Sequence, residues 1–315
     1  MPPGTSWKGP LLGDWRAGGG AFRELGQGAF SEFEADHLVM WENFGDDVAN
    51  AAAMETIGWT ETAVGGQTNF AVNVTKENTG ILLIDCGTDD DSGTNLQANL
   101  APTAARISRI HKTIGPITAS PTNLDNNDII LATKIGWSSE AAWDHKLVFG
   151  WVMTDTALMA PATGALTGIG TGGGVGFHFD EAGDIYYFTQ RTTYAANFAE
   201  VDTGIDVTDP TQTYTVAADG KTNWMGYAIR LCYVDTSDDD NNGWCEFYMN
   251  PSDTPGAWVH VGTVVNNNPY TNTVVYSPTI EVISGDTAGN DVVFGFGGLL
   301  QAKSKYMRER SAPAI

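Results

Sequence analysis

The stretch WMGYAIRLCYV at 224–234, followed by DTSDDDNNG at 235–243 and WCEFYM at 244–249, determines the expected fold. Large apolar side chains occupy every second position of its first part, and small or polar residues stand between them. The large residues are Tyr227, Ile229, Leu231 and Tyr233. A period of two is that of a β-strand with one buried face. The acidic segment with Asn and Gly is typical of a turn, so the stretch predicts a β-hairpin.

Further strands are predicted on both sides of this hairpin, separated by turn clusters such as DDDSGTN, NLDNN, DEAGD and AADGK. They cover 56–62, 68–76, 79–86, 104–112, 127–137, 145–154, 174–180, 184–190, 213–217, 224–234, 244–250, 257–265, 273–284 and 291–298. Helix is expected only before these strands, beginning within 30–44 and again after Asp46 and Asp47. Strands without intervening helices favour an antiparallel sandwich. We therefore expect one all-β domain over 34–300.

The charge of the chain restricts its partners. Its 315 residues include 16 Lys and Arg against 38 Asp and Glu, a formal net charge of −22. Such a surface repels nucleic acid and anionic membranes, so we expect neither as a partner. No apolar stretch approaches the about 18 residues of a membrane span, and the first residues lack the pattern of a secretion signal. We therefore expect synthesis and folding in a cytoplasm.

Two motifs resemble ligand-binding loops in their spacing. A G-x-G-x-x-G match at Gly168, Gly170 and Gly173 precedes a hairpin rather than a helix, so it predicts a surface loop and not a nucleotide site. Asp238, Asp240 and Asn242 have the spacing of a calcium loop, and they are the candidate metal ligands. The twelfth position of that loop needs a Glu but is Met249, which favours an acidic hairpin tip. The five scattered histidines indicate no other metal site, so we expect no cofactor, with calcium as the alternative.

No catalytic residues are expected from the sequence. Glycosidases on β-sandwiches often carry E-x-D-x-x-E on one strand, whereas most acids here lie in predicted turns and the strand acids Glu246 and Glu281 stand alone. Hydrolysis is therefore disfavoured, and we expect a protein that is not an enzyme. Cys232 and Cys245 flank the acidic turn, where they are either reduced, as is usual in a cytoplasm, or bonded to each other.

The two ends of the chain differ from its middle. Residues 1–33 are rich in Gly and Pro and have no apolar period, which predicts an extended arm, and 301–315 form a short basic tail. Isolated large apolar residues in the arm are the candidate docking residues for a partner. They are Trp7, Leu11, Leu12, Trp15, Phe22 and Leu25. Docking or trimerisation of the domain would also cover the exposed sheet edges.

A family likeness extends over about 40–298. It rests on WENF (41–44), IGWTET (57–62), GILLIDCGTDDDSGTN (80–95), DIILATKIGW (128–137), KLVFGWVM (146–153), VGFHFDEAGDIYYF (175–188) and WCEFYMNPSDTPGAWVHVGTV (244–264). In this order the segments resemble the concanavalin A-like jelly-roll domains of virion proteins from tailed bacteriophages. The final segment departs from the family pattern, because Asn250-Pro251-Ser252 stands where a Gly is expected. The acidic, Lys-poor composition looks like that of a phage of marine bacteria.

The resemblance implies a jelly-roll sandwich and a structural role. The expected function is a non-enzymatic protein that decorates or cements the outside of a capsid, with the major capsid protein or other virion proteins as partners and a homo-oligomer, such as a trimer, as its state. It would lie on the virion surface after synthesis in the host cytoplasm. The alternatives are a carbohydrate- or receptor-binding tail or fibre protein and, from another class, a glycoside hydrolase.

Overall fold

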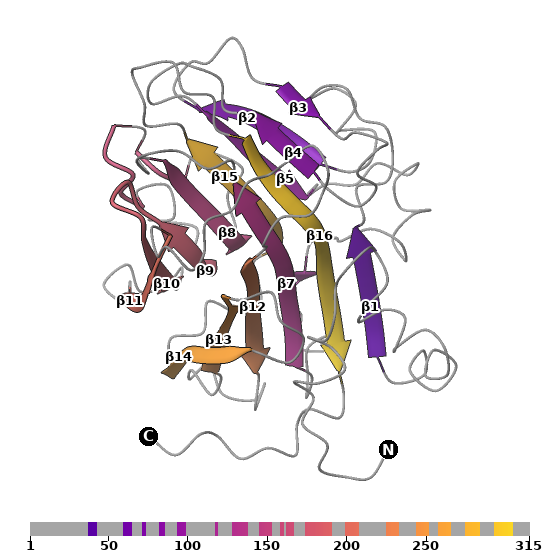
Figure 1. The fold of residues 1–315 in the computed structure, drawn as a ribbon. Helices are drawn as coiled ribbons and strands as arrows, with labels where there is room; N and C mark the ends of the chain where they lie inside the picture. The colour runs from indigo at the N-terminus through magenta and orange to yellow at the C-terminus, as the bar shows by residue number, and fades with distance from the viewer. Residues whose placement is uncertain are drawn as a thin grey trace.

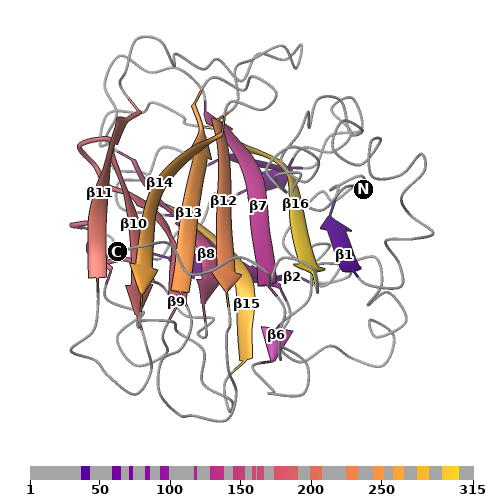
Figure 2. The same cartoon turned by 90° about the horizontal axis from the view of Figure 1, so that it is seen from below.

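The protein is a sandwich of two antiparallel β-sheets in a computed structural model (Figures 1 and 2). The structure describes residues 37–42, 59–64, 71–73, 82–85, 93–98, 117–118, 128–137, 145–152, 158–160, 162–166, 174–190, 199–207, 225–232, 244–251, 258–265, 275–283 and 293–304. These ranges contain strands, turns and bridges and no helix, and hence no helix that is long and apolar enough to cross a membrane. The predicted all-β antiparallel sandwich is confirmed.

Each sheet has eight strands. Sheet A runs through β14 (Val259–Val265), β13 (Trp244–Asn250), β12 (Met225–Cys232), β7 (Asp128–Trp137), β16 (Val293–Ser304), β4 (Leu82–Asp85) and β3 (Ala71–Asn73), and β1 (His37–Glu42) pairs with β16. Sheet B runs through β11 (Ala199–Asp206), β10 (Asp184–Gln190), β9 (Gly174–Phe179), β8 (Lys146–Val152), β15 (Val275–Ile283), β5 (Gly93–Ala98) and β2 (Trp59–Val64), and β6 (Ile117–Thr118) pairs with β15.

Aromatic side chains fill the space between the sheets. Phe177 of β9 meets Tyr227 of β12 and Phe247 of β13 edge to face, with ring centroids 5.3 and 5.6 Å apart. Tyr187 of β10 stacks on Phe247 at 4.6 Å. A Cβ on Gly262 of β14 would lie 2.3 Å from the Tyr187 ring, so only glycine leaves room for this stack. These contacts fix which residues of sheet B point inward, and the residues between them point to the outer face.

The hairpin predicted at 224–249 is present as β12 and β13, and its register places Arg230 opposite Glu246. The predicted strand at 184–190 coincides with β10, and 244–250 with β13. The helical start expected within 30–44 is wrong where the structure describes it, because His37–Glu42 form β1 and pair with β16. Strands β5, β6 and β11 were not predicted. The strands expected at 104–112 and 213–217, and the short helix after Asp47, lie outside the described residues.

Candidate functional site

A row of side chains crosses the outer face of sheet B. Residues directly opposite each other in an antiparallel pair share a face. His178 of β9 is opposite Tyr186 of β10, and Tyr186 is opposite Asp202 of β11. Their neighbours Phe177 and Tyr187 point into the core. The three polar side chains therefore lie together on the surface of sheet B that faces away from sheet A.

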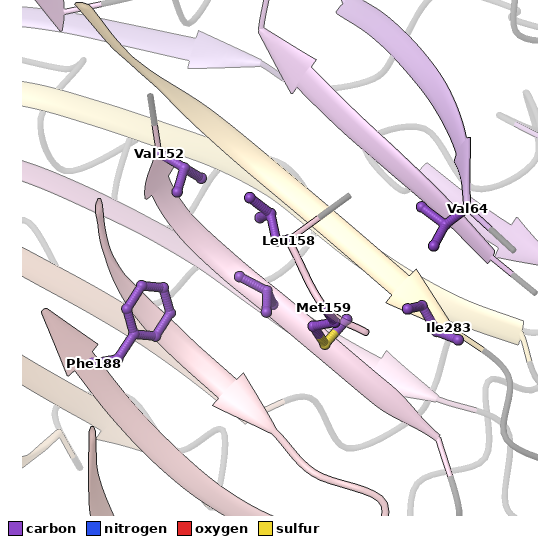
Figure 3. Packing of buried hydrophobic residues seen from close by; sticks show 7 residues of the cluster. Val64, Val152, Leu158, Met159, Phe188 and Ile283 are labelled. Carbon is purple, nitrogen blue, oxygen red and sulfur yellow. The ribbon is translucent and has the colours of Figure 1, made fainter. Parts of the chain in front are cut away.

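The middle of this outer face is covered by residues 158–160 and 162–166, which we call the strap. Leu158 and Met159 are buried with apolar residues of sheet B (Figure 3). These are Val64, Val148, Val152, Phe188 and Ile283, with Leu166 packed against them. In Figure 3 Leu158 and Met159 lie between Phe188 on one side and Val64 and Ile283 on the other. The strap therefore covers the part of this face that lies beneath Leu158 and Met159.

Glu281 of β15 fastens the strap to the sheet. Its side chain is fully buried, and its carboxylate accepts hydrogen bonds from Leu158 N at 2.9 and 2.8 Å and from Met159 N at 2.8 Å. Hydrogen bonds from backbone N–H groups to a carboxylate are among the stronger hydrogen bonds in proteins. Glu281 thus holds a covering segment more than a hundred residues away in sequence.

The buried His178 pairs with the solvent-exposed Glu200 beside the strap. His178 is 4% exposed, and its Nδ1 lies 2.5 Å from Glu200 Oε1. An ionised carboxylate only accepts hydrogen bonds, so Nδ1–H is the donor. In the neutral ring Nε2 then carries the lone pair. Nε2 is buried and has no hydrogen-bond partner among the described residues. A carboxylate that orients a histidine whose second nitrogen is free is the arrangement of a general base.

Tyr186 is the aromatic member of the site. Its ring lies next to His178, with centroids 6.1 Å apart and planes inclined by 31°. Its hydroxyl is 3.5 Å from Asp184 Oδ2. Burial, and then the charges of Asp180, Asp184 and other acids, raise the pKa of Tyr186 to about 12. The phenol therefore stays protonated near neutral pH, and it can donate a hydrogen bond or a proton.

Four aspartates crowd the end of the row, and we call them the acidic cluster: Asp180, Asp184, Asp202 and Asp206. Asp180 shapes the turn between β9 and β10, because Oδ1 accepts bonds from Ala182 N and Asp184 N at 3.0 Å. Burial raises the pKa of Asp184, and the charges of the other three aspartates raise it further. Lys146 Nζ lies 3.7 Å from Glu181 of the same turn. Asp184 therefore interacts electrostatically with the other three aspartates at this end of the row.

The outer face of sheet A carries a second polar group. Arg230 Nη1 donates to Glu246 Oε2 at 2.7 Å, and the Tyr248 hydroxyl donates to the same oxygen at 2.6 Å. Burial and the bond to Glu246 raise the pKa of Tyr248. Glu246 is thus held by two side chains of sheet A. Removing one partner of such a buried pair leaves an uncompensated charge, so this group serves the structure.

Most residues singled out in the sequence lie elsewhere or outside the described ranges. The calcium candidates Asp238, Asp240 and Asn242 and the six docking residues of the arm lie outside them. Within the described ranges, no group of three or more His, Cys, Asp or Glu side chains is placed to hold a metal ion. Cys245 is buried and free, so it is not bonded to Cys232. The sequence analysis missed His178 and Glu200, whose pairing depends on strand register.

Solved structures with a similar fold include carbohydrate-related proteins. An alginate lyase, Aly36B, in complex with alginate trisaccharide has 10% identity and a TM-score of 0.45, covering 84% of this chain and 97% of the lyase. A β-1,3-glucanase from Mycobacterium marinum has 10% identity and a TM-score of 0.42, covering 83% and 97%. The carbohydrate recognition domain of Emp46p has 8% identity and a TM-score of 0.44, covering 83% and 97%. No family model and no curated protein matches the chain.

These comparisons agree with the jelly-roll sandwich and correct the expected function. The structures of similar fold include enzymes, namely alginate lyases and a β-1,3-glucanase, so the exclusion of an enzyme was wrong. The non-enzymatic decorating role that depended on this exclusion falls with it. The likeness to virion proteins of tailed phages and the virion location stay predictions.

Proposed function

We propose that the chain is a carbohydrate-active enzyme whose site is the His178–Glu200 pair with Tyr186 on the outer face of sheet B. The carrying observation is His178, whose Nδ1 is bonded to a carboxylate while the buried Nε2 has no partner among the described residues. A saccharide suits the surroundings, because carboxylates accept hydrogen bonds from hydroxyl groups and an aromatic ring offers an apolar face. The proposal rests on these residues and not on the distant likeness of fold.

The proposed reaction is hydrolysis of a glycosidic bond. Nε2 of His178 takes a proton from a water molecule, whose oxygen forms the new bond to the anomeric carbon. The bond between that carbon and the glycosidic oxygen breaks, and the Tyr186 hydroxyl gives its proton to the leaving oxygen. Glu200 holds the His178 ring in the required tautomer and stabilises the imidazolium that forms. Proton transfers of this kind typically contribute about 10² to 10⁴ in rate.

The test is hydrolysis by the full chain and its variants, followed as reducing ends released from a panel of neutral, amino-sugar and acidic polysaccharides. Replacing the base in His178→Ala should lower kcat by about a hundredfold or more. Glu200→Gln should lower kcat with little change in KM, and Tyr186→Phe should reduce the rate by removing the proton donor.

His260 provides a matched control, because it is an exposed histidine on the outer face of sheet A. His260→Ala should keep the full rate, and circular dichroism should show that all variants are folded. Because His178 is buried, His178→Gln is measured beside His178→Ala. Hydrolysis by both variants at the wild-type rate would refute the assignment, and so would a wild-type protein that hydrolyses none of the polysaccharides.

A further inference from the structure

Strands β10 and β11 of the proposed site do not pair regularly. Between the pairs Asp184–Asp206 and Tyr186–Asp202, β10 advances by two residues and β11 by four. Three residues of β11, 203–205, therefore stand opposite one residue of β10, and we call them the β11 bulge. A bulge bends its strand and redirects side chains, and bulges are frequent at sheet edges and next to active sites. This one lies at one end of the strand order of sheet B, directly beside the proposed site.

The β11 bulge determines which acid stands beside His178. If the pairing at the start of β10 continued without extra residues, Phe188 would be opposite Asp202. Glu200 would then lie two residues further along the sheet, a displacement of about 7 Å. In the structure Glu200 is instead opposite Phe188, and its Oε1 lies 2.5 Å from Nδ1 of His178. The hydrogen bond that orients the proposed base therefore depends on the bulge.

A threonine and a glycine shape the β11 bulge. The Thr203 hydroxyl donates to Ile185 O at 2.6 Å and accepts a bond from Ile205 N at 3.2 Å. Because Ile185 directly precedes Tyr186, the first of these bonds also holds the peptide group that leads into the tyrosine. Gly204 has φ +70°, a conformation that glycine adopts at no steric cost. The bulge is thus held from β11 by the Thr203 hydroxyl and made accessible to the backbone by Gly204.

We propose that Thr203 and Gly204 are positioning residues of the site, because the bulge that they form keeps Glu200 within reach of His178. The inference rests on the proposed function, since it concerns the orientation of the same base. The two residues act through Glu200, which holds the ring of His178 with the proton on Nδ1. A displacement of the carboxylate by about 1 Å would lose most of this bond, since such bonds usually span about 2.7–3.2 Å. The ring could then take its other tautomer, with the proton on Nε2.

The experiment measures the tautomer of His178 and the rate of hydrolysis in the full chain. Long-range ¹H–¹⁵N NMR spectra distinguish the two tautomers, and the loss of a signal in His178→Gln assigns it. At a pH of about 8, where an ordinary histidine is neutral, the wild type should carry the proton on Nδ1. Thr203→Val keeps the shape of the side chain and removes the hydroxyl, so it should show a substantial share of the other tautomer. Its kcat should fall by about tenfold or more, with KM within about twofold of the wild type.

Three further variants serve as comparisons. Thr203→Ser keeps a hydroxyl and should restore both the tautomer and kcat. Thr263→Val makes the same replacement at a partly buried threonine of β14 in sheet A, and it should change neither. Gly204→Ala strains the bulge at an exposed position and should act in the same direction as Thr203→Val. It takes the place of Thr203→Val if circular dichroism shows that this variant does not fold.

The outcomes separate the inference from the proposed function. The wild-type tautomer in the folded bulge variants would overturn the inference, and so would a lower kcat without a change of tautomer. A change of tautomer in a protein that hydrolyses none of the polysaccharides would refute the proposed function and leave the role of the bulge standing. A wild type with the proton on Nε2 would overturn both, because His178 would then not donate to Glu200.

Discussion

Glu281 links two parts of the sandwich that are far apart in sequence. Its carboxylate is the acceptor for two successive backbone N–H groups of the strap, Leu158 and Met159, and all three residues are buried. Buried N–H groups that lose their acceptor cost free energy, because water cannot replace the lost bond. The position of the strap therefore depends on one side chain that carries no part of the proposed chemistry.

Glu281→Ala should lower the free energy of unfolding by about 2–5 kcal/mol, because two buried donors lose their acceptor. Glu281→Gln keeps a carbonyl oxygen as acceptor and should cost less. Urea denaturation gives both values. Val259→Ala is the control, since this side chain is 48% exposed, and it should change stability by less than about 0.5 kcal/mol. Equal stability of Glu281→Ala and Val259→Ala would contradict the role of Glu281.

The ionisation of Asp184 should lower the stability of the folded protein as the pH rises. Its pKa is raised in the folded protein above the ordinary 3.8, so the folded state binds the proton more tightly than the unfolded chain does. The cost of ionising it therefore appears as the pH rises through the interval above 3.8 and is fully present above the folded pKa. Asp184→Asn should raise the melting temperature at neutral pH and lose this advantage below pH 3.8. Asp128→Asn provides the comparison, and a gain of the same size at both pH values would contradict the explanation.

At the scale of elements, hairpins were predictable from the sequence and the site was not. Strands β10 and β13 have runs of large apolar residues and adjoin turn residues, so local pattern locates them. β5 has the sequence GTNLQA and β11 has AEVDTGID, and neither has a run of large apolar residues. They are strands because their neighbours pair with them. His178 meets Glu200 across three strands, so no local spacing indicates the pair.

Gly262 of β14 should tolerate no side chain. A Cβ at this position would approach the Tyr187 ring to 2.3 Å, and the ring is held by its stack on Phe247. Gly262→Ala should therefore cost about 1–3 kcal/mol of stability through overpacking. Gly204→Ala tests backbone strain alone, since that residue has φ +70° and nothing within 4 Å of the added Cβ. Thermal unfolding of Gly262→Ala, Gly204→Ala and the double variant Tyr187→Ala/Gly262→Ala measures the clash. The double variant should be free of it, because the ring that the added Cβ would meet is gone.

At the scale of the whole molecule, the net charge of −22 opposes the folded state. Compact chains with many like charges repel themselves, and salt screens the repulsion between exposed groups. Raising the salt concentration from about 0.01 to about 0.15 M should therefore raise the melting temperature. The Asp184→Asn/Asp202→Asn variant should show a smaller rise. A melting temperature that stays constant or falls in the wild type would show that local ion pairs outweigh the net repulsion.

The pairing of β16 with β7 determines when the two sheets can be completed during synthesis of the protein. β7 ends at Trp137 and β16 begins at Val293, yet the two are neighbours in the middle of sheet A, and β15 is likewise inserted between β8 and β5 in sheet B. Most of the chain must therefore be synthesised before the strand pairing of either sheet can be completed. Until then β7 and β8 have unpaired edges, which are open to wrong partners. Newly made chains should consequently depend on chaperones during the interval between the synthesis of β8 and the arrival of β15 and β16.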